Sequence, residues 1–252
     1  MREGYPLRRF TIKDWLLIVL TSSLVLQFLV TILSVKTISF FPEYIIGSFQ
    51  SEEEMINQLV YLAASAGTII SLPLTLWVIY KNKIPLFNRK QLSKEDSFII
   101  RGLSKSDWKF LLYYIPGSFL LYSLGYSFIV SVFGEGEAVN QLAVESMFNH
   151  LPIWQIFLMT VIVAPIVEEI LFRGLVLFSA GEKRTSWIRV IISSLLFGLV
   201  HNPTNISSFY TYVGMGFIFS YAGKRTESLE APIIYHFLNN LMGFISLVFY
   251  MN

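Results

Sequence analysis

The chain has 252 residues, of which 54% are hydrophobic and only 14% are charged. Soluble domains carry about 25% charged residues, so this composition excludes an ordinary soluble protein and predicts an all-α polytopic membrane protein, residues 1–252 forming one integral membrane domain. A net charge of +2 argues against nucleic acid as a partner, and the absence of cysteine excludes disulfides, thiolate metal sites and a cysteine nucleophile.

Seven apolar runs approach or reach the roughly 20 residues that a helix needs to cross a bilayer. They are Trp15–Leu33, Gln58–Tyr80, Phe110–Phe133, Ile153–Ala180, Ile188–His201, Ile206–Ala222 and Ala231–Tyr250. The fifth and sixth are short and are separated by a turn at Pro203, so a re-entrant pair is the alternative to two full crossings. Between the third and fourth runs, Val139–His150 is expected to form a short interfacial helix on the outer surface.

The basic residues predict the orientation of these runs. If the amino terminus is cytoplasmic and the chain crosses seven times, all but two of the 19 lysines and arginines fall inside, the exceptions being Lys36 and Arg173. The carboxyl terminus is then outside. The basic inner loop Lys81–Lys109 is a candidate for contact with the headgroups of membrane lipids, although topogenic charge alone also accounts for it.

The fourth run carries Glu168, Glu169 and Arg173 in its middle. Each ionisable group at the centre of a membrane helix costs roughly 2.5–3.5 kcal/mol on insertion scales, so the cluster is a functional-site hypothesis. At about 100° per residue, Glu169 and Arg173 lie within roughly 40° of each other and are expected to form an ion pair, which leaves Glu168 as the candidate general base. Pro165 removes an amide donor nearby, and we expect it to kink the helix and open a wet cavity.

Further polar side chains occur at the end of the fifth run and in the seventh. His201 ends the fifth run, and His236 lies four residues before Asn240, hence on the same helix face. A lone histidine near a helix end is usually a hydrogen-bonded core residue. Two histidines, an asparagine and a carboxylate pair on three apolar helices instead predict one shared polar site. The third histidine, His150, is assigned no role.

The inventory of residues excludes three known kinds of intramembrane peptidase. The only aspartates, Asp14, Asp96 and Asp107, lie outside the apolar runs, which excludes an aspartyl enzyme. No His-Glu-x-x-His motif is present, which excludes a zinc enzyme of that type, and no Gly-x-Ser-Gly frames a serine nucleophile. Hydrolysis centred on a glutamate and assisted by histidines remains.

These residues resemble the motifs of the CPBP family, which contains the type II CAAX prenyl endopeptidases and the bacterial bacteriocin-processing or Abi proteins. Glu168 to Arg173 is similar to the family's Glu-Glu-x-x-x-Arg motif. Phe197-x-x-x-His201 and His236-x-x-x-Asn240 resemble its second and third motifs. The resemblance covers residues 150–245, which are expected to form the catalytic core.

The resemblance implies an intramembrane endopeptidase that acts on a peptide or a lipidated protein. It implies that Glu168 is the base for the attacking water, that His201 holds this water, and that His236 and Asn240 stabilise the oxyanion. Glu169 and Arg173 would shape the site.

Both the cofactor and the activity have alternatives at this stage. Glu168, His201 and His236 could supply the three protein ligands of a divalent metal such as zinc, but that glutamate would then be a poor base, so the metal stays open. One alternative function is a non-catalytic scaffold or bacteriocin-immunity protein that regulates a partner membrane protein. Another is a proton-coupled transporter that uses the same side chains as a relay.

Overall fold

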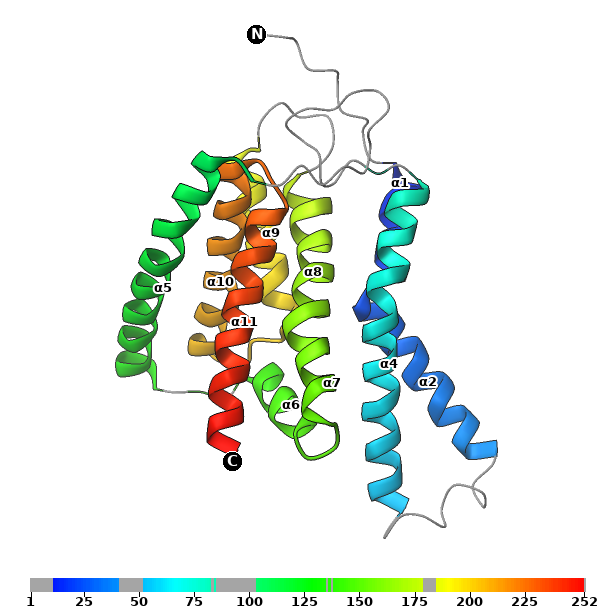
Figure 1. Ribbon diagram of the computed structural model, residues 1–252. Helices are drawn as coiled ribbons and strands as arrows, with labels where there is room; N and C mark the ends of the chain where they lie inside the picture. Colours follow the sequence, from blue (N-terminus) through cyan, green and yellow to red (C-terminus); the bar gives the residue numbers. More distant parts are fainter. Residues whose placement is uncertain are drawn as a thin grey trace.

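The computed structural model of the protein describes residues 11–40, 52–82, 84, 103–134, 136, 138–178 and 185–251, and every regular element in these ranges is a helix (Figure 1). The predicted all-α fold is confirmed. In Figure 1 the helices that follow residue 150 stand together beside α5, and the first three helices stand along their other side.

The amino-terminal helices show that the first apolar run is broken. Helix α1 (Ile12–Thr21) and helix α2 (Ser23–Phe40) meet at a bend of 51°, where the Ser22 hydroxyl donates to the carbonyl of Val19. Helix α4 (Glu52–Lys81) packs along α2, and the two backbones approach closely at Gly67: a Cβ there would lie 2.8 Å from the Cα of Gln27. A serine hydroxyl that bonds back to a carbonyl of its own helix often accompanies a bend, and here it satisfies the carbonyl of Val19.

The fourth run forms one rod of 25 residues that alternates between α-helical and π-helical turns. It comprises α7 (Ile153–Phe157), η1 (Leu158–Val163), α8 (Ala164–Glu169) and η2 (Ile170–Leu177). The rod continues through Pro165 as a single span, with a π-helical segment on either side of the short α8. Such π turns are frequent at functional sites, and the acidic pair Glu168 and Glu169 lies at the end of α8, between the two π-helical segments.

Three helices surround the rod and form the core with it: α9 (Trp187–Val200), α10 (Ile206–Thr226) and α11 (Glu230–Met251). Phe172 of η2, Phe197 of α9 and Phe219 of α10 pack edge to face, at ring distances of 5.3 and 6.0 Å. Each ring is almost wholly buried. This aromatic centre fixes the helices on which the predicted site residues lie.

Two further helices flank this core. Helix α5 (Lys105–Phe133) packs on α10, where the hydroxyl of Tyr114 donates to the carbonyl of Ile218. Helix α6 (Val139–Met147) confirms the predicted short helix, and all of its residues are exposed or half-buried. Its far end is attached to α4, because Tyr61 bonds to Ser146 and stacks on the ring of His150.

The predicted count of seven spans is not confirmed. Within the described ranges, four helices are long and apolar enough to cross a membrane, and the bent pair of α1 and α2 makes a fifth if it is one span. Helix α9 has 14 residues, about 21 Å, against a hydrocarbon core of about 30 Å. Helix α10 is long enough but is interrupted by glycine, serine and threonine, which lower its hydropathy. The chain is nevertheless an integral membrane protein.

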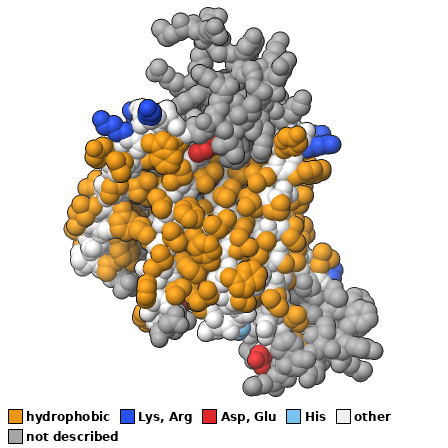
Figure 2. Space-filling model, viewed as in Figure 1, with side chains coloured by type: hydrophobic (Ala, Val, Ile, Leu, Met, Phe, Trp, Pro, Cys, Tyr) orange, Lys and Arg blue, Asp and Glu red, His pale blue; other side chains and the backbone are white. Residues whose placement is uncertain are grey.

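Basic side chains gather at one end of the bundle. Lys81 ends α4, Lys105 begins α5, and Lys224 and Arg225 lie in the last turn of α10. These helix ends lie together at the top of Figure 1, and Figure 2 shows Lys and Arg side chains there above a face covered with hydrophobic side chains. The helix directions agree with the predicted topology, while its assignment to the cytoplasm stays a prediction. Most of the basic loop Lys81–Lys109 falls outside the described residues.

Candidate active site

The predicted base, Glu168, faces both predicted histidines. It lies near the end of α8, with 18% of its side chain exposed, and its Oε2 is 3.8 Å from Nε2 of His201 and 3.9 Å from Nε2 of His236. This oxygen is buried and has no hydrogen-bond partner among the described residues. Three helices therefore bring a carboxylate and two imidazoles to one point, at separations that leave room for a small molecule to bridge them.

The expected ion pair is present beside this point. Arg173 donates from Nη1 to Oε1 of Glu169 at 2.9 Å and from Nη2 to the carbonyl of Gly216 at 2.8 Å, and both charged side chains are fully buried. The guanidinium also lies 4.5 Å from the centre of the Phe197 ring. A buried charge needs such partners, because removing it from water costs several kcal/mol.

Glu169 has a second contact that its position in the sequence did not predict. Its Oε1 lies 2.9 Å from Nδ1 of His236, a residue 67 positions away on α11. A carboxylate accepts at that position, so the proton on Nδ1 points to Glu169 and Nε2 turns toward Glu168. Glu169 therefore links the Arg173 ion pair to the orientation of the imidazole.

The His201 ring is held in the corresponding way. Its Nδ1 lies 2.7 Å from the carbonyl of Phe197, one helical turn earlier, so Nδ1 donates and Nε2 faces the site. The ring of Tyr212 stacks on it at 4.6 Å with an interplanar angle of 16°, and Phe197 packs at 4.6 Å. The two histidines thus present Nε2 to the same carboxylate from opposite helices.

Asn240 is fixed by a carbonyl that Pro165 leaves without a backbone donor. In the π turn the N–H of Ala164 bonds to Met159 instead of Thr160, and the next residue, Pro165, has no N–H to offer. The carbonyl of Thr160 instead accepts from Nδ2 of Asn240 at 2.8 Å. A buried carbonyl needs a donor, which explains the contact between rod and α11 at this place. One of the two amide hydrogens of Asn240 remains for another acceptor.

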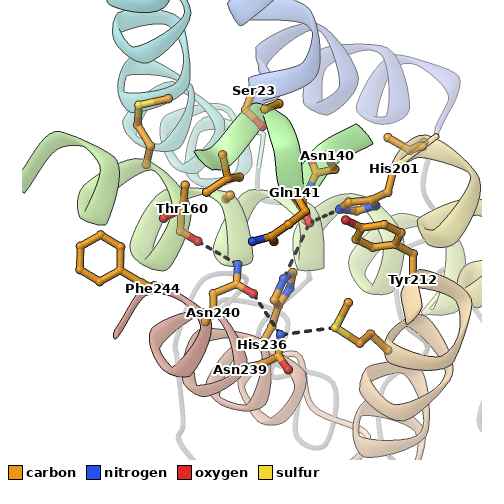
Figure 3. A pocket seen from close by; sticks show the side chains of 18 of the residues that line it. Ser23, Asn140, Gln141, Thr160, His201, Tyr212, His236, Asn239, Asn240 and Phe244 are labelled. Atoms are coloured by element: carbon orange, nitrogen blue, oxygen red, sulfur yellow. Dashed lines mark hydrogen bonds and ion pairs between the residues drawn. The ribbon is translucent and has the colours of Figure 1, made fainter. Parts of the chain in front are cut away.

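Glu168, both histidines and Asn240 line a cavity of about 390 Å³, whereas Glu169 and Arg173 are not among its lining residues. Figure 3 shows His201, His236, Asn239 and Asn240 around it, together with Gln141 of α6. Ser23 and Gln27 of α2 and Thr68 of α4 line its far side, so the cavity reaches from the core to the amino-terminal helices.

Sequence reasoning missed several residues of this cavity, namely Asn140, Gln141, Thr160, Tyr212 and Asn239. Only the pair on α6 carried a signal, because two adjacent amides on a short surface helix have no obvious structural role. The others are uncharged residues on long helices, where nothing in the sequence distinguishes a lining residue from a packed one.

Residues 150–242 match the model of the Rce1-like type II CAAX prenyl endopeptidases. This range includes all three motifs, and the structure brings those motifs together around one cavity. This part of the chain belongs to the CPBP family.

Relatives of the CPBP segment are similar over about half of their length. The chain is 33% identical over 134 residues to the protein named "Putative membrane peptidase YdiL" of Bacillus subtilis, over 52% of this chain and 53% of that one. It is 33% identical to the membrane-embedded CAAX protease MroQ of Staphylococcus aureus, over 53% and 57% of the two chains. It is 36% identical to the UPF0177 protein YbdI of Lactococcus lactis, over 44% and 57%. No solved structure matches the chain.

Glu168, His201 and His236 are the residue types of a catalytic zinc site, but their facing atoms lie farther apart than zinc ligands do. Ligand atoms at about 2.0–2.2 Å from zinc lie roughly 3.3–3.6 Å from one another. Here Oε2 of Glu168 lies 3.8 and 3.9 Å from the two imidazole nitrogens, and the described residues contain no group of three or more His, Asp or Glu arranged to hold a metal ion. We therefore derive no catalytic step through a metal.

Proposed function

We propose that the protein is an intramembrane endopeptidase that hydrolyses a peptide bond in a peptide or lipidated protein, using water activated by Glu168. One observation carries the proposal: Oε2 of Glu168 is buried without a partner and faces Nε2 of both His201 and His236. A water that bridges these atoms would satisfy the oxygen and lie next to a base. The family match and the names of the relatives support the same class of activity.

In the proposed reaction the bridging water loses one proton to Glu168 as its oxygen attacks the carbonyl carbon of the scissile bond. The carbonyl oxygen becomes an oxyanion. Glu168 then returns the proton to the nitrogen of the leaving amine as the carbon–nitrogen bond breaks, so the carboxyl group ends in its starting state. A base that is within reach of water typically contributes a factor of about 10²–10⁴ to such a reaction.

Two donors would stabilise the oxyanion. Asn240 has one amide hydrogen left after its bond to Thr160. His236 donates from Nε2 only when the ring carries both protons, and Glu169 accepts the one on Nδ1. Donors of this kind typically contribute about 3–4 kcal/mol each to the reduction of the barrier. Arg173 acts through Glu169 and is in this scheme a positioning residue.

The experiment compares histidines inside and outside the site. The full chain is reconstituted in liposomes with a library of randomised peptides. Both the wild-type protein and the His150→Gln variant are expected to cleave peptides. His150 is a matched control because it stacks on Tyr61 and lies outside the cavity lining. Glu168→Gln, His201→Gln and His236→Gln should each lower cleavage by at least about 10²-fold while the protein stays folded.

Two results would overturn the proposal. Cleavage by Glu168→Gln at the wild-type rate would show that Glu168 is not the base. Absence of cleavage by a folded wild-type protein would favour a binding role. A chelator added to the same assay tests the metal: we expect no effect, whereas loss of cleavage that zinc restores would assign Glu168, His201 and His236 as ligands.

We further propose that the basic end of the bundle faces the cytoplasm. The chain has no cysteine, so single-cysteine variants report one position each. A membrane-impermeant maleimide should label Asn149→Cys in intact cells and Lys105→Cys only after the cells are opened. The reverse pattern would invert the topology.

A further inference from the structure

A second cavity adjoins the catalytic one. It has a volume of about 800 Å³ and lies between α5, α6 and α10. Gln141, Thr211 and Tyr212 line both cavities, so the two spaces meet at these side chains. Tyr212 is also the ring that stacks on His201. The second cavity is therefore next to the proposed reaction centre, on the side away from α2 and α4.

Hydroxyl groups line much of the second cavity, and the hydrogens of three serine and threonine side chains among them are already used. Ser123 donates to the carbonyl of Phe119, Ser127 donates to that of Ser123, and Thr211 donates to that of Ser207, each within its own helix. A hydroxyl in this state presents oxygen lone pairs to its surroundings. These three side chains therefore present hydrogen-bond acceptors to the cavity.

The charged side chain on the cavity wall is also a hydrogen-bond acceptor. Glu145 of α6 lines the cavity, and its Oε1 accepts from Nε2 of Gln141 at 3.0 Å. A carboxylate is an acceptor only. The wall thus favours a ligand that brings hydrogen-bond donors, and an acyl chain brings none.

An extended peptide is such a ligand. Its backbone N–H groups have no partners of their own, and each would cost several kcal/mol if it were left unsatisfied in an apolar environment. We propose that the second cavity binds the main chain of the substrate on one side of the scissile bond, as an extended segment that donates N–H groups to these oxygens. The inference rests on the proposed function, since it places the bond to be cut at Glu168.

The other side of the substrate has a path as well. The catalytic cavity extends from Glu168 to Ser23, Gln27 and Thr68 on α2 and α4. A substrate segment would then cross under α6, from α5 on one side to α2 and α4 on the other. The exposed or half-buried character of α6 throughout suits a helix that lies over a bound chain.

The first test fills the second cavity. Ser127 is exposed and bonds only to its own helix in the described structure, so Ser127→Trp should fold. Ser131→Trp is the matched control: Ser131 lies one turn further along α5, bonds likewise to its own helix, and is not among the described residues that line either cavity. With randomised peptides we expect Ser127→Trp to raise KM about tenfold for long peptides, and to leave peptides that are truncated on the corresponding side unchanged.

The second test does not need cleavage, so it separates this inference from the proposed activity. In a Glu168→Gln background, Ser127→Cys is treated with randomised peptides that carry a pyridyl disulfide. The introduced thiolate attacks the peptide's disulfide, forms a mixed disulfide and releases pyridinethione. We expect adduct formation that unmodified peptides suppress, and no such suppression in Ser131→Cys.

Several outcomes would overturn the inference. Cleavage of long peptides by Ser127→Trp at the wild-type KM would contradict it. Adducts at Ser127→Cys that unmodified peptides do not suppress would contradict it too. Equal reaction with an alkyl pyridyl disulfide that lacks a peptide would assign the cavity to lipid. If wild type cleaves nothing but the adduct forms and is suppressed by peptides, the peptide site stands and the hydrolytic function fails.

Discussion

The amino-terminal helices and the carboxyl-terminal bundle both bury polar side chains, but they satisfy them differently. In α4 the hydroxyls of Thr68 and Ser71 donate to carbonyls of the same helix, at Ala64 and Thr68. In the bundle, Glu169 alone joins Arg173 on its own helix to His236 on another. A buried hydroxyl can be satisfied by a carbonyl of its own helix, whereas these buried ionic groups have partners on more than one helix. The proposed catalytic site and the packing of the bundle therefore depend on the same contacts.

The largest effect should come from removing the bundle's buried cation. Arg173→Ala leaves Glu169 buried beside one partner, so we expect a loss of about 3–5 kcal/mol in the free energy of unfolding. Arg225→Ala is the control, because Arg225 is exposed and contacts only the face of Phe110 in the described structure, a contribution of about 1 kcal/mol or less. Thermal unfolding in detergent measures both. Glu168→Ala should lower the melting temperature less than Arg173→Ala, and equal values would contradict the ion-pair argument.

A smaller effect, on catalysis alone, should come from removing the side-chain amide of Asn240. We expect Asn240→Ala to lower kcat by about 10²–10³ as its oxyanion donor is lost. Asn239→Ala should lower it far less, because Asn239 lines the same cavity but donates to Met215 and to the Asn240 side chain. Steady-state cleavage of one library peptide measures both variants, and equal values of kcat would remove Asn240 from the reaction.

The amino-terminal helices can be tested through their close approach. Gly67→Ala places a Cβ 2.8 Å from the backbone of Gln27, and we expect a loss of about 1–3 kcal/mol. Gly117→Ala on α5 is the matched control: its Cβ would meet no described atom within 4 Å, so removing glycine from a helix should stabilise by up to about 1 kcal/mol. Unfolding in detergent distinguishes them, and an unchanged Gly67→Ala would show that α2 moves aside at little cost.

The smallest effect should come from a hydroxyl in the amino-terminal helices that bonds to another helix instead of its own. Thr75 donates to the carbonyl of Thr21 across two helices at 2.9 Å, whereas the Thr68 hydroxyl bonds within α4. Thr75→Val should cost about 0.6 kcal/mol, and at most about 1.7, while Thr68→Val stays near zero. Equal stabilities of the two variants would mean that the hydrogen bond between α1 and α4 contributes nothing measurable.

The same difference between local and distant contacts explains what the sequence could predict. The ion pair of Glu169 and Arg173 followed from a spacing of four residues, and it is present. The contact of Glu169 with His236 joins residues 67 positions apart, and helix geometry contains no information about it. Membrane segments were found by hydropathy, but the break at Ser22, where the serine hydroxyl donates to the carbonyl of Val19, was not.

The length of the helices shows a further limit. The fifth run was predicted as a short segment over Ile188–His201, and α9 covers Trp187–Val200, 14 residues, with His201 as its cap residue. Its apolar length left open whether it crosses the membrane or forms a re-entrant pair with the next helix. Apolar length alone therefore predicts which segments enter the membrane better than how far each one reaches.

The bond between Asn240 and Thr160 places stability and activity in opposition at one backbone position. An alanine at position 165 would be the better helix former, and its N–H would compete for the carbonyl that now holds the amide. The rod would gain a backbone hydrogen bond and become more stable, while the proposed oxyanion donor, Asn240, would lose the contact that orients it. A weak point in the hydrogen bonding of one helix is thus what aligns a reactive group on another.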